Sequence, residues 1–128
     1  MLAAAHTVWL DDDTYGRELR AYVAEVATAL GVGPESTMVD ATAPASAYLA
    51  LDGSAPSFPD RDLALLWDER TGWSAVAETH SGDDLVLGRP DPVHGVRPEP
   101  AVLTRFVRAV LAGDIAAGDI AIAPSLTG

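Results

Sequence analysis

The feature that most constrains the fold is a pair of apolar segments joined by a short turn that ends in glycine. Residues 63–68 and 73–80 alternate with the two-residue period of β-strands, and Glu69-Arg70-Thr71-Gly72 separates them. A type I turn followed by glycine in the left-handed region closes such a hairpin, because glycine adopts positive φ without steric cost. The sequence therefore predicts an antiparallel hairpin whose register is counted outward from Gly72.

Counting outward from the turn assigns the side chains of the hairpin to two faces. With Glu69 opposite Trp73, alternate residues give one apolar face, which we expect to lie under helices. The apolar face carries Leu63, Leu65, Trp67, Ala75 and Ala77. The mixed face carries Asp62 opposite His80, Ala64 opposite Glu78 and Leu66 opposite Val76, and a neighbouring strand adds Tyr48.

Helical periodicity flanks the predicted strands on both sides in the sequence. Apolar residues recur at helical spacing over residues 15–30, Asp12 or Asp13 can cap the N-terminus of this helix, and Gly31 ends it. A second helix is predicted over residues 100–112, where a proline suits the first turn and apolar residues again share one face. Each helix therefore has an apolar face that the sheet can cover.

Shorter segments between the helices complete the predicted sheet. Residues 47–52 and 84–87 have the composition of strands, and residues 36–42 are a further candidate strand. The order of elements predicts an α+β fold. We expect a two-layer sandwich with an N-terminal helix, an antiparallel sheet of three or four strands, and a C-terminal helix packed on the same sheet face.

The composition is that of one globular domain. The chain has 128 residues, of which 48% are hydrophobic, and its eight Arg and 19 acidic residues give a net charge of −11. So apolar a chain can bury a core, which argues against a disordered acidic tail, and its charge repels nucleic acid and anionic membranes. We expect a single domain over residues 1–128, with residues 1–10 and 114–128 as weakly ordered extensions.

Two features that the sequence lacks limit the possible cellular compartments and the possible types of catalytic and metal site. The chain has no Cys, which excludes disulfides, thiolate metal sites and cysteine nucleophiles. The apolar run at its N-terminus lacks the basic region of a signal peptide and is too short to span a bilayer. These features predict a cytoplasmic protein.

The mixed face of the sheet holds the candidate site. A fully solvated face would carry more charge than this one, so its apolar centre indicates a surface for a ligand or a partner. An acid beside a histidine at its border can transfer protons near neutral pH. The candidate residues are Tyr48, Leu66 and Val76 for binding, and Asp62, Glu78 and His80 for acid–base chemistry.

Neither a metal nor a cofactor is predicted. The chain has no calcium-binding loop spacing, too few His for zinc, and no glycine-rich loop that opens a helix. A plain structural role for the same residues stays open, because a terminal segment could cover the mixed face. Glu78 and His80 would then be solvated residues at a strand end. The sequence leaves open whether the protein is an enzyme.

One set of segments has a family likeness. It comprises Tyr22-Val23 with Ala29-Leu30-Gly31-Val32, residues 47–53, residues 58–69 with Gly72-Trp73, and Arg105-Phe106-Val107. This set resembles a family of small uncharacterised actinobacterial proteins. The resemblance covers about residues 20–112, and the stretch from Leu49 to Trp73 is its distinctive part. It implies a cytosolic actinobacterial origin and a domain of unknown function, and it assigns no activity or catalytic residue.

The sequence as a whole predicts a small acidic module that binds a partner protein, or itself, through the mixed sheet face. The alternative is a small-molecule enzyme or ligand-binding protein of specialised metabolism, which would use the same face as a pocket with acid and base residues. A small ligand would be neutral or basic, given the net charge of −11. No nucleic acid and no membrane is expected as a partner.

Overall fold

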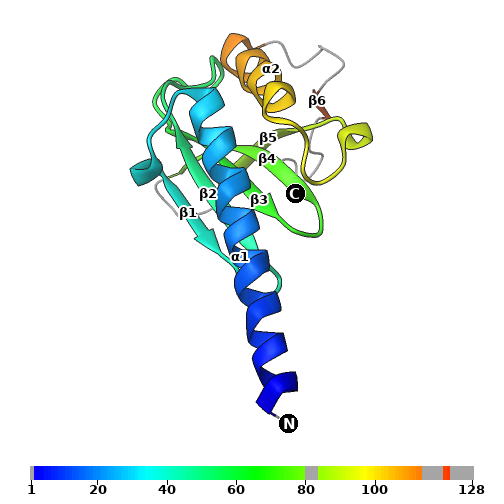
Figure 1. Cartoon of the computed structure of the whole chain (residues 1–128). Coiled ribbons are helices and arrows are strands. Elements are labelled where there is room, and N and C mark those ends of the chain that lie inside the picture. The colour runs from blue at the N-terminus through cyan, green and yellow to red at the C-terminus, as the bar shows by residue number, and fades with distance from the viewer. Residues whose placement is uncertain (1, 80–83, 114–119, 122–128) are drawn as a thin grey trace.

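In the part of the chain that the structure describes, the fold consists of two helices, one sheet and two short 3₁₀ helices (Figure 1). The computed structural model describes residues 2–79, 84–113 and 120–121, and the side chains of residues 14–79 and 84–113. The elements are α1 (Leu2–Leu30), η1 (Pro34–Ser36), β1 (Thr37–Asp40), β2 (Ser46–Leu51), β3 (Leu63–Asp68), β4 (Gly72–Ala77), β5 (Leu85–Pro90), η2 (Pro92–His94), α2 (Pro100–Ala112) and β6 (Ile120–Ala121).

The strands form an antiparallel meander in chain order, from β1 to β5. The main sheet has five strands rather than the three or four predicted, because the candidate segment 36–42 does form β1 and pairs with β2. The short strand β6 pairs with the end of β5. The rest of the C-terminal extension lies outside the described residues.

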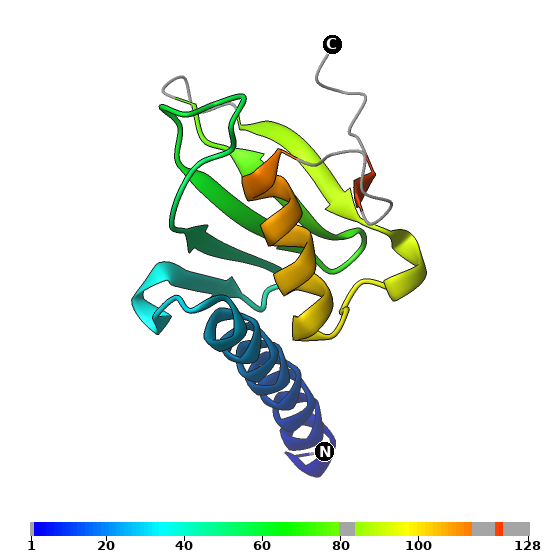
Figure 2. The same ribbon diagram turned by 90° about the horizontal axis from the view of Figure 1, so that it is seen from above.

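Both helices pack on the same face of the sheet, as predicted (Figures 1 and 2). Every second residue of each strand points towards the helices, and the apolar stripe of each helix points back, so that one core forms between the two layers. The predicted α+β sandwich is confirmed. The largest buried side chains are Leu19, Val23, Val26, Leu103 and Phe106 from the helices, Leu49, Leu63, Leu65, Trp67 and Trp73 from the helix-facing side of the strands, and Val76 from the other side of the sheet.

Helix α1 begins at Leu2, so the prediction that it starts after a cap at Asp12 or Asp13 is wrong. The residues before Asp12 contain no proline or glycine and are rich in Ala and Leu, which have high helix propensity. The other end of the helix agrees with the prediction. Gly31 has a left-handed φ of +76°, and its N–H donates to the Thr28 carbonyl at 3.1 Å.

The β3–β4 hairpin has the predicted turn but not the predicted register. The Thr71 N–H donates to the Asp68 carbonyl at 3.2 Å, and Gly72 has a φ of +82°. Asp68 pairs with Gly72, so Glu69 does not lie opposite Trp73. The reason is that Gly72 is itself the first residue of β4 and pairs with β3, whereas the prediction places it in the turn. The resulting shift is an even number of residues, and each side chain therefore stays on its predicted face.

Candidate binding surface on the open sheet face

The sheet face opposite the helices, called the open face below, is hollowed into a groove. The groove reaches from β1 to β5 and has a volume of about 540 Å³. Asp40, Asp68 and Arg89 supply its charged groups. All of the predicted binding residues line it, and they share it with residues that the sequence did not suggest. The apolar and small polar lining comes from Met38, Tyr48, Leu66, Ser74, Val76 and Val86.

Tyr48 connects the groove to the predicted acid–base residues. Its hydroxyl donates a hydrogen bond to the Glu78 carboxylate. Tyr48 pairs with Leu66 on β3, and the Glu78 N–H donates to the Asp62 carbonyl at 2.8 Å, so this hydrogen bond joins β2 to the end of β4 across β3. The hydrogen bond to the carboxylate, helped by partial burial, raises the pKa of Tyr48 to about 12.

Tyr48 is therefore expected to ionise well above the usual tyrosine pKa of about 10. Because the folded state holds this proton more tightly, Tyr48 stabilises the fold fully below about pH 10 and loses that contribution as the pH rises to about 12. Phenolate absorbance, taken as wild type minus Tyr48→Phe, measures the midpoint. Glu78→Gln should move the midpoint towards 10, and an unmoved midpoint would contradict the assigned cause.

The predicted catalytic residues do not form the predicted pairs. The sequence pairs Asp62 with His80 and Ala64 with Glu78, but the shifted register places Asp62 opposite Glu78. The Asp62 side chain is exposed, the Glu78 side chain is half-buried, and His80 lies outside the described residues. The described part of this site is thus two carboxyl groups and the Tyr48 phenol. Together, these carboxyl and phenol oxygens can accept hydrogen bonds from a neutral or cationic donor group of a ligand.

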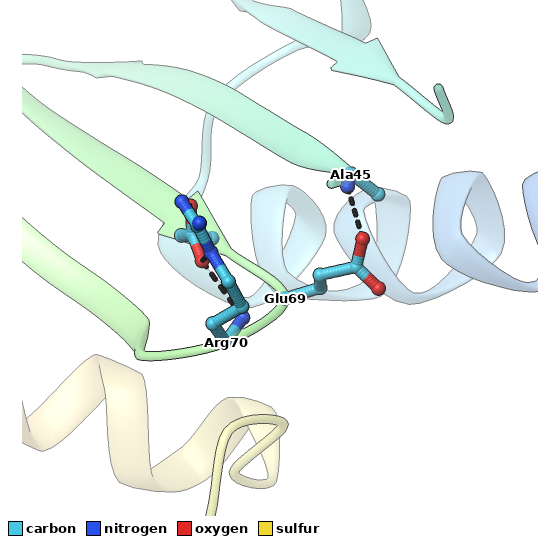
Figure 3. Close-up of polar contacts among 4 residues, drawn as sticks. Ala45, Glu69 and Arg70 are labelled. Atoms are coloured by element: carbon cyan, nitrogen blue, oxygen red, sulfur yellow. Dashed lines mark hydrogen bonds and ion pairs between the residues drawn. The ribbon is translucent and has the colours of Figure 1, made fainter. Parts of the chain in front are cut away.

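The β3–β4 turn ties the sheet to the β1–β2 loop (Figure 3), and a hydrogen bond from Tyr15 ties it to α1. The Glu69 carboxylate accepts a hydrogen bond from the Ala45 N–H, and the Glu69 N–H donates to the Ala45 carbonyl at 3.1 Å. Tyr15 of α1 donates to the same carboxylate at 3.4 Å. The Arg70 side chain diverges from Glu69 and pairs with Asp68 at 3.0 Å, and its hydrogen bonds lower the pKa of Asp68 to about 2.

Glu69→Ala is expected to lower the free energy of unfolding by about 1–2 kcal/mol, because the N–H of the buried Ala45 loses its acceptor. Glu69→Gln keeps an oxygen that can accept this hydrogen bond and should cost less than half as much. Urea unfolding followed by circular dichroism measures both losses. Equal losses would contradict a role as acceptor and indicate that the negative charge matters instead.

Trp67 and Trp73 belong to the core and offer no ring face to a ligand. Each is only 2% exposed. The Trp67 Nε1 donates to the Val96 carbonyl at 2.7 Å, and the Trp73 Nε1 donates to the Tyr22 hydroxyl at 3.1 Å. The Arg97 guanidinium lies 5.5 Å from the ring centroid of Trp67 and 5.9 Å from that of Tyr22. These contacts fasten the segment before α2 to the core.

Two further properties concern the part of the chain that the structure describes. Among those residues, no group of three or more His, Asp or Glu side chains is placed to hold a metal ion. The same residues include no helix that is both long enough and apolar enough to cross a membrane.

Sequence reasoning missed part of the groove. Met38 lies in a segment that is only a candidate strand in the sequence, with no face assigned to it. The predicted strand ends at Leu87, so Arg89 falls in a loop, whereas β5 continues to Pro90. The two-residue period was the signal that could have found Met38, because it places Met38 on the face of Tyr48, its partner across β1 and β2.

Comparison with known proteins identifies one family. The profile of a family of unknown function (DUF6292) matches residues 22–109, which include all strands that line the groove and most of α2. No curated protein and no solved structure matches the chain. The family match covers well over half of the sequence and the whole of the main sheet. The chain therefore belongs to this family of unknown function.

Proposed function

We propose that this protein is a small acidic module that binds a partner protein through the groove of the open face. The observation that carries the proposal is Met38, whose side chain is 70% exposed beside its cross-strand partner Tyr48. Leu66, which is half-buried, continues the same apolar lining, whereas Val76 lines the groove but is fully buried. A single exposed apolar side chain is ordinary, but a flexible methionine that extends an apolar groove is typical of a binding surface.

The charge of the chain favours a basic partner. The net charge is −11, and Asp40 places an exposed carboxylate at the β1 end of the groove, whereas Asp68 is already paired with Arg70 at 3.0 Å and Arg89 lies at the β5 end. Hydrogen bonds from Thr42 lower the pKa of Asp40, and those from Arg70 lower that of Asp68, which favours their ionised forms. Two copies of this chain would bring like charges together, so we assign the groove to a different protein.

The proposed compartment is the cytoplasm. The chain has no Cys and so has no disulfides that would need an oxidising compartment. Fractionation of the source cells tests this part of the proposal, and recovery of the protein only outside the cytoplasm would contradict it.

Site-specific crosslinking in the source cells tests the proposed binding. A photoreactive amino acid at Met38 should capture the partner, whereas the same residue at Val93, which is 80% exposed and lies outside the groove, should not. The captured protein is then purified and titrated. We expect Met38→Asp to weaken its binding about tenfold or more, because a desolvated contact is lost, and the matched variant Val93→Asp to bind like wild type.

Three results would contradict the proposal or change it. The proposal fails where the captured protein binds Met38→Asp as tightly as wild type, or where Met38 and Val93 capture the same proteins. Capture of a second copy at Met38, together with a dimer mass in analytical ultracentrifugation, would replace the basic partner by self-association.

A small molecule is the second candidate for the groove. Its volume of about 540 Å³ lies within the usual range of ligand pockets, and Tyr48 links its lining to the Glu78 carboxylate, which lies beyond the lining and can attract a basic ligand. Asp62, Glu78 and His80 would be the groups that transfer protons. A nuclear magnetic resonance screen of neutral and cationic fragments should then shift the methyl signals of Leu66, and Glu78→Gln should weaken the cationic fragments selectively. Unshifted methyl signals would contradict this alternative.

A further inference from the structure

Strand β1 borders the sheet, and its outer side pairs with no other strand in the described part of the chain (Figure 1). The ladder shows which backbone groups face outward. The Glu69 N–H donates to the Ala45 carbonyl, so odd-numbered residues from Ala45 onward bond to β3 and even-numbered residues bond to β1. Tyr48 therefore bonds to Met38, and the N–H and C=O of Val39 point outward from the sheet.

Hollows flank this edge on both faces of the sheet. On the helix side, a hollow of about 440 Å³ lies between α1 and β1 and is lined by Val23, Ala27 and Val39. On the open side, the groove reaches β1 at Met38 and Val39. An added strand would therefore find space for side chains on both of its faces, since successive side chains of a strand point to opposite sides.

We propose that an extended segment of a basic partner protein pairs with β1 as an additional strand of the sheet. The inference rests on the function proposed above and specifies how the partner enters the groove. Val39 provides one donor and one acceptor to the backbone of this segment. Alternate side chains of the segment then point into the groove and into the hollow beside α1.

The charges around the edge define the side chains of the partner segment. On the open side, Asp40 is an exposed carboxylate on β1 itself, whereas Arg89 lies across the groove on β5. On the helix side, Arg20 lines the hollow together with the apolar Val23 and Ala27. The partner side chains on the open side are therefore basic, and those that face α1 are apolar.

A second copy of the chain is a poor occupant of this edge. Strand β1 has only four residues, and it ends in the charged Asp40. Pairing of two β1 strands would bring two copies of this carboxylate to one edge, whereas a basic segment would bring a cation to it. The net charge of −11 on each copy opposes such pairing further.

A displayed library of random peptides is the probe, with the purified full chain as bait. We expect the enriched peptides to alternate basic and apolar residues. Val39→Pro should weaken binding of the synthetic peptides about tenfold, because the peptide carbonyl loses its donor. Proline is tolerated on an edge strand where its missing N–H faces outward. The matched control Val39→Ala keeps the N–H and should bind within about threefold of wild type.

Hydrogen exchange on the wild-type chain gives a readout that does not depend on the folding of a variant. The Val39 amide should exchange rapidly in the free protein and become protected when a peptide binds. The Met38 amide is bonded to β2 in both states and should change little. Unchanged exchange at Val39, equal binding of peptides by Val39→Pro and wild type, or a library without enriched peptides would overturn the inference.

Met38→Asp separates this inference from the proposed function. Peptides whose affinity is unchanged by Val39→Pro but weakened by Met38→Asp bind the open face without strand addition. In that case the proposed function stands and this inference falls. Peptides whose affinity is unchanged by Met38→Asp but weakened by Val39→Pro support strand addition and show that the open face does not contribute to binding. Protection of Val39 that rises with the concentration of the free protein identifies a second copy as the occupant and overturns the basic partner.

Discussion

Replacing Trp67 by alanine is expected to lower the free energy of unfolding by about 3–5 kcal/mol. Trp67 is 2% exposed and lies between the two layers of the fold. Its Nε1 donates to the Val96 carbonyl at 2.7 Å, and the Arg97 guanidinium lies 5.5 Å from its ring. Alanine therefore removes core volume, a hydrogen bond and a cation–π contact together. Urea unfolding followed by circular dichroism measures the loss.

Leu66→Ala is the matched control, because Leu66 is the next residue on the same strand but points to the open face. It is half-buried and lines the groove, so its replacement should cost about 1 kcal/mol. Trp67→Phe keeps an aromatic ring in the core but loses the donor to Val96, and it should fall between the other two variants. Equal losses for Trp67→Ala and Leu66→Ala would contradict the assignment of the two faces.

The faces of the hairpin could be predicted from the sequence because alternation alone decides them. Leu65 and Trp67 are buried towards the helices, although the predicted register is shifted. An even shift keeps each side chain on its face, whereas an odd shift would have reversed every one. The bounds of α2 were predictable for a different reason. Pro100 begins this helix, and Gly113 follows it with a left-handed φ of +73°.

The polar contacts of the site could not be predicted, because they join residues that are distant in the sequence. The hydrogen bond from Tyr48 to Glu78 depends on the relative register of three strands. The hydrogen bond from the Ala45 N–H to Glu69 depends on the path of the β1–β2 loop. Local propensity carries no information on either, so the candidate groove could be located from the sequence but its polar border could not.

Gly72→Ala is expected to lower the free energy of unfolding by about 2–3 kcal/mol, because two penalties add at this residue. Gly72 has a φ of +82°, and this conformation costs a residue with a β-carbon about 1 kcal/mol. An added Cβ would also lie 3.2 Å from the Val96 Cα and 3.4 Å from the Val96 carbonyl oxygen. These are backbone atoms, so the backbone at Val96 must shift by a few tenths of an ångström to relieve the contact.

Gly31→Ala isolates the first of these penalties. Gly31 has a φ of +76°, and no heavy atom of the described residues lies within 4 Å of an added Cβ, so the loss should be about 1 kcal/mol. The difference between the two variants in urea unfolding is the cost of displacing Val96. The Trp67 Nε1 proton donates to the Val96 carbonyl, so its resonance should shift in Gly72→Ala and not in Gly31→Ala. Equal losses with an unmoved Trp67 resonance would show that the contact with Val96 relaxes without cost.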